Sequence, residues 1–236
     1  MTAQLHALAI DAVDPNGLAR FWGELLQREL ITDPYGVVAL APGAAPGFGL
    51  RFPATRQPKV TANWTYFDLT SPSDQGQQEI VAKALDLGAQ HIDVGQRPEE
   101  GHVVLADPEG NEFCVIEPDN KFLEGCGPVG ALASDGTQAV GYFWAKVLDW
   151  PLVWDQDEET AIQSPQGGTK ITWGGPPVAD KVGKVRLHFD LRADGDQLDE
   201  AARLESLGAR RVDIGQGEVP WIVLADPDGN EFCLWP

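Results

Sequence analysis

The sequence is poor in cysteine, in methionine and in basic residues, and it contains no long hydrophobic run. Its 236 residues include 3 Cys and 1 Met, and 17 Lys+Arg stand against 36 Asp+Glu, for a formal net charge of −19. Three cysteines without a CxxC spacing exclude a disulfide framework and indicate a reducing, cytoplasmic location. The acidic balance argues against nucleic acid and membrane surfaces as partners. Without a basic start or a run of about 20 apolar residues, the sequence predicts neither a signal peptide nor a transmembrane helix.

What the sequence does contain is an internal repeat. LADPEGNEFC (105–114) returns as LADPDGNEFC (224–233) with nine of ten residues identical, and FWGELLQREL (21–30) is matched by FWAKVLDWPL (143–152). The displacement is close to half of the chain, which indicates a tandem duplication. The predicted organisation is an N-terminal domain, a linker and a C-terminal domain, covering residues 1–118, 119–128 and 129–236.

Each half of the chain divides again into two strand–helix–strand–strand–strand units. The first helix is predicted to begin at Pro15 behind the capping residue Asp14, because Pro is favoured at the first helical position. Apolar residues at helical spacing then follow. The helices are predicted over residues 15–27, 75–88, 138–148 and 196–208. The fold class is therefore α+β, built from four βαβββ modules.

Four βαβββ modules, helices reading xLAxFW and turns reading DPxGNEFC resemble the vicinal oxygen chelate superfamily, and within it the glyoxalase-like domain branch. The segments KVRLHFDLRADGDQLDEAARLESLGARRVDIG and WIVLADPDGNEFCLWP carry the resemblance most strongly. The superfamily includes glyoxalase I, bleomycin-resistance proteins and extradiol dioxygenases. The resemblance implies that pairs of modules form cups of curved mixed or antiparallel sheet with helices outside. One cup would come from residues 4–118 and one from 128–236; exchange of modules between the halves is the alternative.

The resemblance also implies a divalent ion in each cup, held by His, Gln and Glu side chains on the first and last strands of the modules. By that pattern the second module of each half would place ligands at His188 and Cys233, and at Tyr66 and Cys114. The last strand of each first module should supply a carboxylate, yet residues 34–67 and 161–179 contain no Asp or Glu. Because too few donors exist for such a centre, we expect no metal and no cofactor.

Several side chains are candidates for a site without a metal. Strand parity puts Asp190 on the same face as His188, where it would orient the imidazole. Cys233 with His188 is a candidate nucleophilic pair, although a buried cysteine is more commonly a small hydrophobe. The catalytic candidates are His188, Asp190, Tyr66 and Cys233. The candidate ligand-binding residues are Trp64, Tyr66, Cys114, Trp173, Arg186, His188, Cys233 and Trp235.

The eight tryptophans and the missing carboxylates favour a metal-free protein that binds a small aromatic or hydrophobic organic molecule, as the bleomycin-resistance members of the superfamily do. The alternative is a metal-independent lyase, isomerase or cyclase that uses His188, Tyr66 or Asp190 as acid or base. A scaffold with plugged cups is a third possibility, and a metal-dependent glyoxalase or dioxygenase is the least favoured. The C-terminal half, which holds His188, is the expected working site. A monomer with two cups and a homodimer both fit the sequence.

Overall fold

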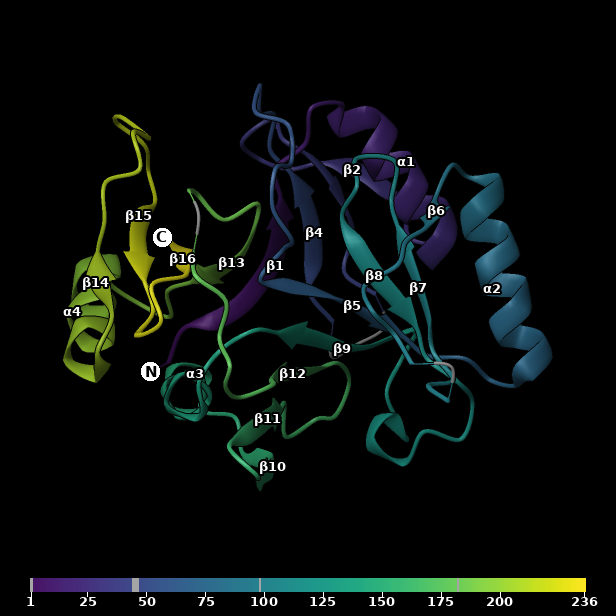
Figure 1. Ribbon diagram of the computed structural model, residues 1–236. Helices are drawn as coiled ribbons and strands as arrows, with labels where there is room; N and C mark the ends of the chain where they lie inside the picture. Colours follow the sequence, from purple (N-terminus) through teal and green to yellow (C-terminus); the bar gives the residue numbers. More distant parts are fainter. Residues whose placement is uncertain (1, 44–46, 98, 182) are drawn as a thin grey trace.

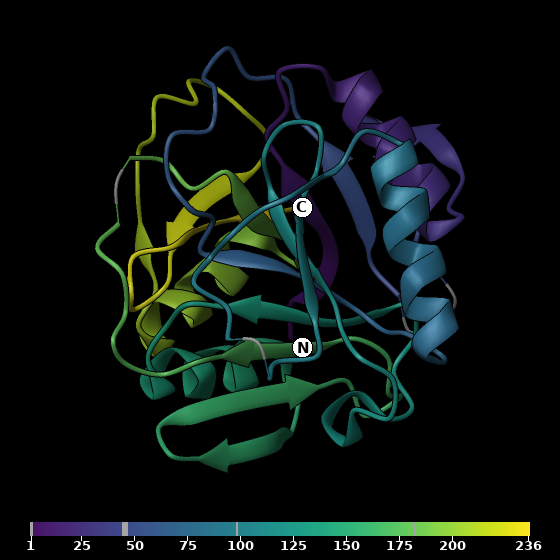
Figure 2. The same ribbon diagram turned by 45° about the vertical axis from the view of Figure 1, so that its right-hand side comes forward.

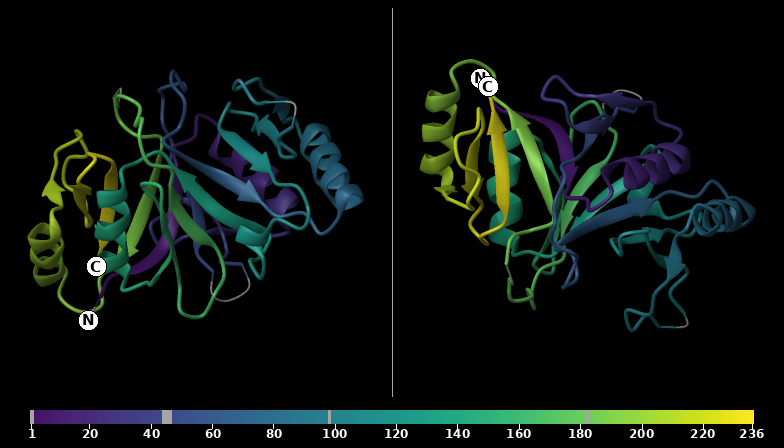
Figure 3. Two further views of the ribbon diagram at one scale, coloured as in Figure 1. Left: turned by 60° about the horizontal axis from the view of Figure 1, so that its bottom comes forward. Right: turned by 90° about the horizontal axis from the view of Figure 1, so that it is seen from above.

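The computed structural model describes residues 2–43, 47–97, 99–181 and 183–236. It contains two eight-stranded sheets, each with both parallel and antiparallel pairs, so the predicted α+β class is confirmed. The helices α2 and α4 lie at opposite ends of the molecule (Figures 1 and 3). Within the described part of the chain, no helix is both long and apolar enough to cross a membrane.

The first sheet has the strand order β14-β15-β16-β13-β1-β4-β3-β2 and forms what we call the outer cup, because it joins the first and last modules of the chain. The first module contributes β1 (Gln4–Ile10), β2 (Leu30–Thr32), β3 (Val38–Leu40) and β4 (Gly49–Phe52). The last module contributes β13 (Leu187–Arg192), β14 (Arg210–Arg211), β15 (Ile222–Ala225) and β16 (Glu231–Trp235). The antiparallel pair β1–β13 holds the two modules together.

The second sheet has the strand order β10-β11-β12-β9-β5-β8-β7-β6 and forms the inner cup from the two middle modules. Its second-module strands are β5 (Thr65–Leu69), β6 (Gln90–His91), β7 (Val103–Ala106) and β8 (Glu112–Val115). Its third-module strands are β9 (Val129–Ser134), β10 (Leu152–Gln156), β11 (Glu159–Gln163) and β12 (Lys170–Trp173). Figure 2 shows the β10–β11 hairpin at the bottom edge of this sheet.

One helix belongs to each module, close to the predicted positions. These helices are α1 (Pro15–Leu26), α2 (Asp74–Asp86), α3 (Gln138–Leu148) and α4 (Gln197–Leu207). Asp14 caps α1 as expected, since its carboxylate accepts a hydrogen bond from the Gly17 N–H at 3.0 Å. The linker between the halves adds a short 3₁₀ helix, η1 (Lys121–Leu123).

The expectation that each half of the chain closes into a cup of its own is wrong, because the sheets pair the first module with the fourth and the second with the third. The linkers at 53–64 and 174–186 cross from one cup to the other, whereas the linker at 116–128 stays within the inner cup. These three linkers have 12, 13 and 13 residues. Their near-equal lengths explain why both pairings were compatible with the sequence.

The main hydrophobic core lies between the two cups and is built twice from equivalent residues. The Trp22 ring of α1 contacts Phe67 and Phe113 of the inner sheet, with centroids 4.7 and 5.1 Å apart. The Trp144 ring of α3 in the same way contacts the outer sheet, 5.0 Å from both Phe189 and Phe232. Helix α1 of the first module and helix α3 of the third module therefore each pack against the cup to which their own strands do not belong.

The repeated DPxGN turns fix these two tryptophans. The indole N–H of Trp22 donates to Asp107 at 3.1 Å, and that of Trp144 donates to Asp226 at 3.2 Å. Both carboxylates are also bonded to backbone and side-chain N–H groups of the asparagine four residues on. The turns thus connect the cups as well as closing their own hairpins.

Candidate functional site: the outer cup

Four polar side chains meet on the floor of the outer cup because the strand register brings them to one face. Asp190 of β13 pairs with Cys233 of β16, and Ala9 of β1 lies between His188 of β13 and Arg51 of β4. Cross-strand partners share a face of the sheet, as do residues two apart. All four line a cavity of about 280 Å³.

A buried chain of charges crosses this floor. The Arg51 guanidinium donates from Nη1 to Asp190 at 2.6 Å and from Nε to Asp33 at 2.7 Å. Asp190 has no solvent exposure, and Arg51 is 6% exposed, so solvent screens these ion pairs weakly. His188 lies beside the chain, with Nε2 3.6 Å from Oδ1 of Asp190. Asp33 belongs to the β2–β3 turn, and these ion pairs therefore hold this turn against the cup floor.

An aromatic stack forms one wall of the cup. The Trp235 ring lies 4.4 Å from the Trp221 ring and 4.5 Å from the Tyr35 ring, centroid to centroid. The guanidinium of Arg51 sits 4.4 Å from the Trp235 centroid, a cation–π distance. Trp221 and Trp235 line the cavity, so the surface that the stack presents to it is aromatic and apolar.

Burial shifts the proton affinities of the site. It lowers the pKa of His188, and the negative charges of Asp190 and Asp11 only partly oppose this. Burial, together with Asp190, raises the pKa of the Cys233 thiol well above its usual range. The site therefore holds a neutral imidazole and a protonated thiol at neutral pH. A protonated thiol is a poor nucleophile, which favours a packing role for Cys233.

The divalent ion that the fold family implies does not fit this site. One ligand atom each from His188, Asp190 and Cys233 lie within 4.8 Å of one another, so the donors do converge. However, Arg51 of the nearby strand β4 lies at the same site, and its permanent positive charge is bound to Asp190. A divalent ion there would face a guanidinium and would have to displace the thiol proton.

The inner cup holds the equivalent residues in a different state. Tyr66 and Asp68 of β5 take the places of His188 and Asp190, because they pair with β9 as those residues pair with β1. Cys114 on the neighbouring strand β8 pairs with Asp68. Burial raises the pKa of Tyr66 and of Cys114, and it raises that of Asp68 to about 7, against a smaller opposing effect of the Cys114 hydrogen bond.

The linker between the halves fills the inner cup. Leu123 packs with Val104, Cys114, Ile116 and Ala131, and Phe122 and Tyr66 lie against this cluster. Lys170 of β12 donates to the backbone carbonyl of Phe122 and lies over its ring. Tyr66 and Cys114 belong to this inner sheet, so they do not line the cavity that His188 lines in the outer cup.

Three further candidates lie outside both cups. Trp173 has no solvent exposure and belongs to the main core. Trp64 and Arg186 line a second cleft, of about 300 Å³, between the crossing linkers. In it Trp64 donates to the Leu187 carbonyl at 2.6 Å, and Arg186 pairs with Glu109.

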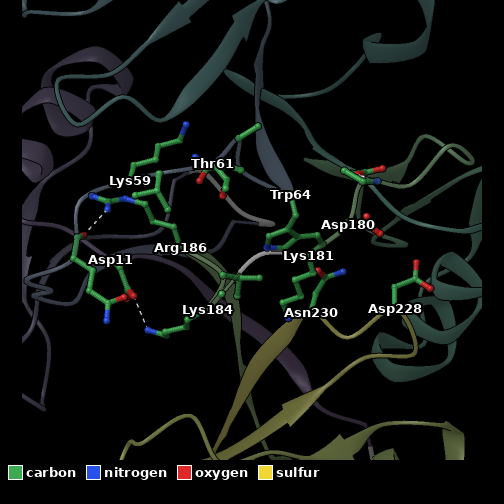
Figure 4. Close-up of a pocket in the computed structure, with 18 of the residues that line it drawn as sticks. Asp11, Lys59, Thr61, Trp64, Asp180, Lys181, Lys184, Arg186, Asp228 and Asn230 are labelled. Atoms are coloured by element: carbon green, nitrogen blue, oxygen red, sulfur yellow. Dashed lines mark hydrogen bonds and ion pairs between the residues drawn. The ribbon is translucent and has the colours of Figure 1, made fainter.

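The basic side chains of this second cleft have acidic partners, and Figure 4 shows one such pair, between Lys184 and Asp11. Lys59 pairs with Glu112 at 2.5 Å and Lys184 pairs with Asp11 at 2.5 Å. Lys181 in turn pairs with Glu231. These ion pairs neutralise the positive charges of the second cleft. Of the eight ligand-binding candidates, His188, Cys233 and Trp235 are brought together.

Sequence reasoning missed Arg51, Asp33, Tyr35 and Trp221. Arg51 carried a usable signal, because it is the only charged residue in the strand GLRF within a stretch that has no acid. Arg51 reaches the site only if the first module pairs with the fourth, and the sequence left that pairing open. Tyr35 and Trp221 lie in loops whose position depends on the same pairing.

Paired βαβββ modules around a cup define the vicinal oxygen chelate class of fold. The chain belongs to the family described as glyoxalase-like domain, whose model matches it twice, at residues 7–116 and 131–235. Glyoxalase I from Zea mays is similar in structure, with a TM-score of 0.71 at 12% identity over 99% of this chain and 92% of that one. A putative dioxygenase from Bacillus subtilis subsp. subtilis str. 168 has a TM-score of 0.65 at 17% identity, over 99% and 84%. At these identities the likeness concerns the fold alone. A search of curated proteins found no match.

Proposed function

We propose that the outer cup binds a small, flat organic molecule without a metal ion, in the manner of a sequestering or resistance protein. The observation that carries the proposal is the Arg51–Asp190 ion pair on the cup floor, where the fold family would hold a metal. The cavity of about 280 Å³ is large enough for one or two aromatic rings, and Trp221 and Trp235 offer an apolar wall to them. Aromatic contacts of this kind contribute about 0.5–1.5 kcal/mol beyond the buried area.

A second candidate function is acid–base catalysis on the bound molecule. It is favoured by the neutral imidazole of His188, which lies beside the Asp190 carboxylate and lines the cavity. Such an imidazole is able to accept a proton from a ligand, and the carboxylate would stabilise the imidazolium that forms. The metal-independent lyase, isomerase or cyclase expected as the alternative would use this pair. Tyr66 would not take part because it lies in the inner cup.

One experiment tests both candidates against a metal site. Val223, which lines the outer cup, is replaced by Phe to fill the cavity. Val104 pairs with Cys114 as Val223 pairs with Cys233, so Val104→Phe in the inner cup is the matched control. Binding of a panel of one- and two-ring aromatic compounds is followed by ligand-observed NMR, and metal retention after dialysis against Zn²⁺, Ni²⁺ or Mn²⁺ by elemental analysis.

We expect aromatic compounds to bind to the wild type and to Val104→Phe but not to Val223→Phe, with less than one ion retained per chain. Ligands recovered unchanged after incubation support sequestration, and altered ligands support catalysis. Retention of one ion per chain that depends on His188 would contradict the proposal. So would aromatic binding that Val223→Phe leaves intact.

A further inference from the structure

The outer cup contains buried polar atoms that have no hydrogen-bond partner among the described residues. They include Oδ1 of Asp190, Nδ1 of His188 and Nε1 of Trp235. All three residues line the same cavity. A buried polar atom without a partner is unfavourable by about 1–3 kcal/mol, and more for a charged group. The penalty is largest for the Asp190 carboxylate, because it is charged and has no solvent exposure.

The charges around the cavity determine which ligand group would satisfy that oxygen. Arg51 is already shared between Asp190 and Asp33, and Lys184 is paired with Asp11 at 2.5 Å. Among the described residues that line the cavity, three are acidic and two are basic: Asp11, Asp190, Glu231, Arg51 and Lys184. An incoming carboxylate would thus find both cations neutralised and would face the free oxygen of Asp190. A neutral group with a proton to donate meets no such repulsion.

A hydroxyl group suits the site better than a pure donor does. It donates one hydrogen bond and accepts others, while the site offers an acceptor on Asp190 and a donor on the Trp235 indole. The aromatic surface of Trp221 and Trp235, which line the cavity, favours an aromatic and therefore planar carrier for this group.

We propose that the outer cup selects a neutral planar molecule that donates a hydroxyl hydrogen bond to Asp190, and that it discriminates against carboxylates of the same shape. This inference rests on the proposed function, since it names the class of ligand for the same cavity. Asp190 is then a specificity-determining residue. Arg51 is a positioning residue that holds the carboxylate on the cup floor.

The test measures the affinity of the full chain for three matched probes by NMR titration at pH 7: 2-naphthol, 2-methylnaphthalene and 2-naphthoate. We expect 2-naphthol to bind about tenfold or more tightly than 2-methylnaphthalene, because a hydrogen bond to a charged group contributes that much. We expect 2-naphthoate to bind more weakly than either. These wild-type ratios test the proposal without any variant.

Two variants then assign the effect. Asp190→Asn should reduce the advantage of 2-naphthol over its methyl isostere and should weaken the exclusion of 2-naphthoate. Asp68→Asn, at the equivalent position of the inner cup, should leave all three affinities unchanged. Equal or tighter binding of 2-naphthoate by the wild type would overturn this inference while the proposed function survives. If none of the three probes binds, the proposed function fails as well.

Discussion

Asp68 and Asp190 occupy equivalent positions in the two cups, and the difference between them predicts a pH-dependent gain in stability for Asp68→Asn. Asp190 is paired with Arg51, whereas Thr172 stands at the corresponding position beside Asp68. Burial without a cationic partner raises the pKa of Asp68 to about 7. The unfolded chain releases this proton near pH 4. The folded state therefore binds more protons between these values, and the free energy of unfolding decreases as the pH rises through this range.

The magnitude follows from the size of the shift. A difference of about three pH units corresponds to about 4 kcal/mol at full effect, and the partial exposure of Asp68 reduces our expectation to about 2 kcal/mol. Asparagine has nearly the same shape and does not ionise, so Asp68→Asn removes the penalty. We expect the variant to match the wild type at pH 5 to within about 1 kcal/mol and to exceed it by about 2 kcal/mol at pH 8.

The assay is urea unfolding followed by tryptophan fluorescence at half-unit steps from pH 5 to pH 8.5. Asp190→Asn is the matched comparison, because it removes a partner from Arg51 and should destabilise the protein by about 2–3 kcal/mol at neutral pH. A stability difference between Asp68→Asn and the wild type that does not change with pH would refute the reasoning. So would a loss of stability in that variant at pH 8.

Two further substitutions test other parts of the structure. Arg51→Met leaves the carboxylates of Asp33 and Asp190 without their cation, so the free energy of unfolding measured in urea should fall by about 3 kcal/mol. The control Thr172→Val, at the equivalent position of the inner cup, should change it by less than about 0.5 kcal/mol. Equal effects of the two substitutions would contradict a stabilising role of the Arg51 ion pairs. Trp22→Phe removes the N–H that donates to Asp107, and Trp144→Phe removes the equivalent N–H that donates to Asp226. Each substitution should lower the free energy of unfolding by about 1–2 kcal/mol. Thermal melts in which only one of the two variants is destabilised would contradict the equivalence of the two halves of the core.

Much of the fold could be predicted from the sequence, because it depends on local signals. Asp14 and Pro15 mark the start of α1 through capping chemistry that involves only neighbouring residues. The repeated DPxGN turns and the apolar periodicity likewise identify the modules. The pairing of modules was not accessible, because it depends on where linkers of nearly equal length cross, and no local residue pattern records that choice.

Only the part of the candidate site that comes from the last module could be predicted from the sequence. His188, Asp190 and Cys233 share a face through strand parity and adjacent register, and this could be inferred from their own module. Arg51 reaches Asp190 from a strand 139 residues earlier in the chain. The sequence therefore showed a shortage of metal-ligating donors, but it did not show that Arg51 lies beside Asp190.

The exchange of modules also orders the steps by which the protein is built. The inner cup joins modules that follow each other in the chain, so its strands are all available once residue 173 has been synthesised. The outer cup needs β1 to pair with β13, in which Ala9 lies opposite His188, 179 residues later in the sequence. Contacts of such long range are slow to form. On the ribosome β1 can pair early with β4 of its own module but not with β13, so the cavity that we assign to the ligand is completed only after β16 has been made.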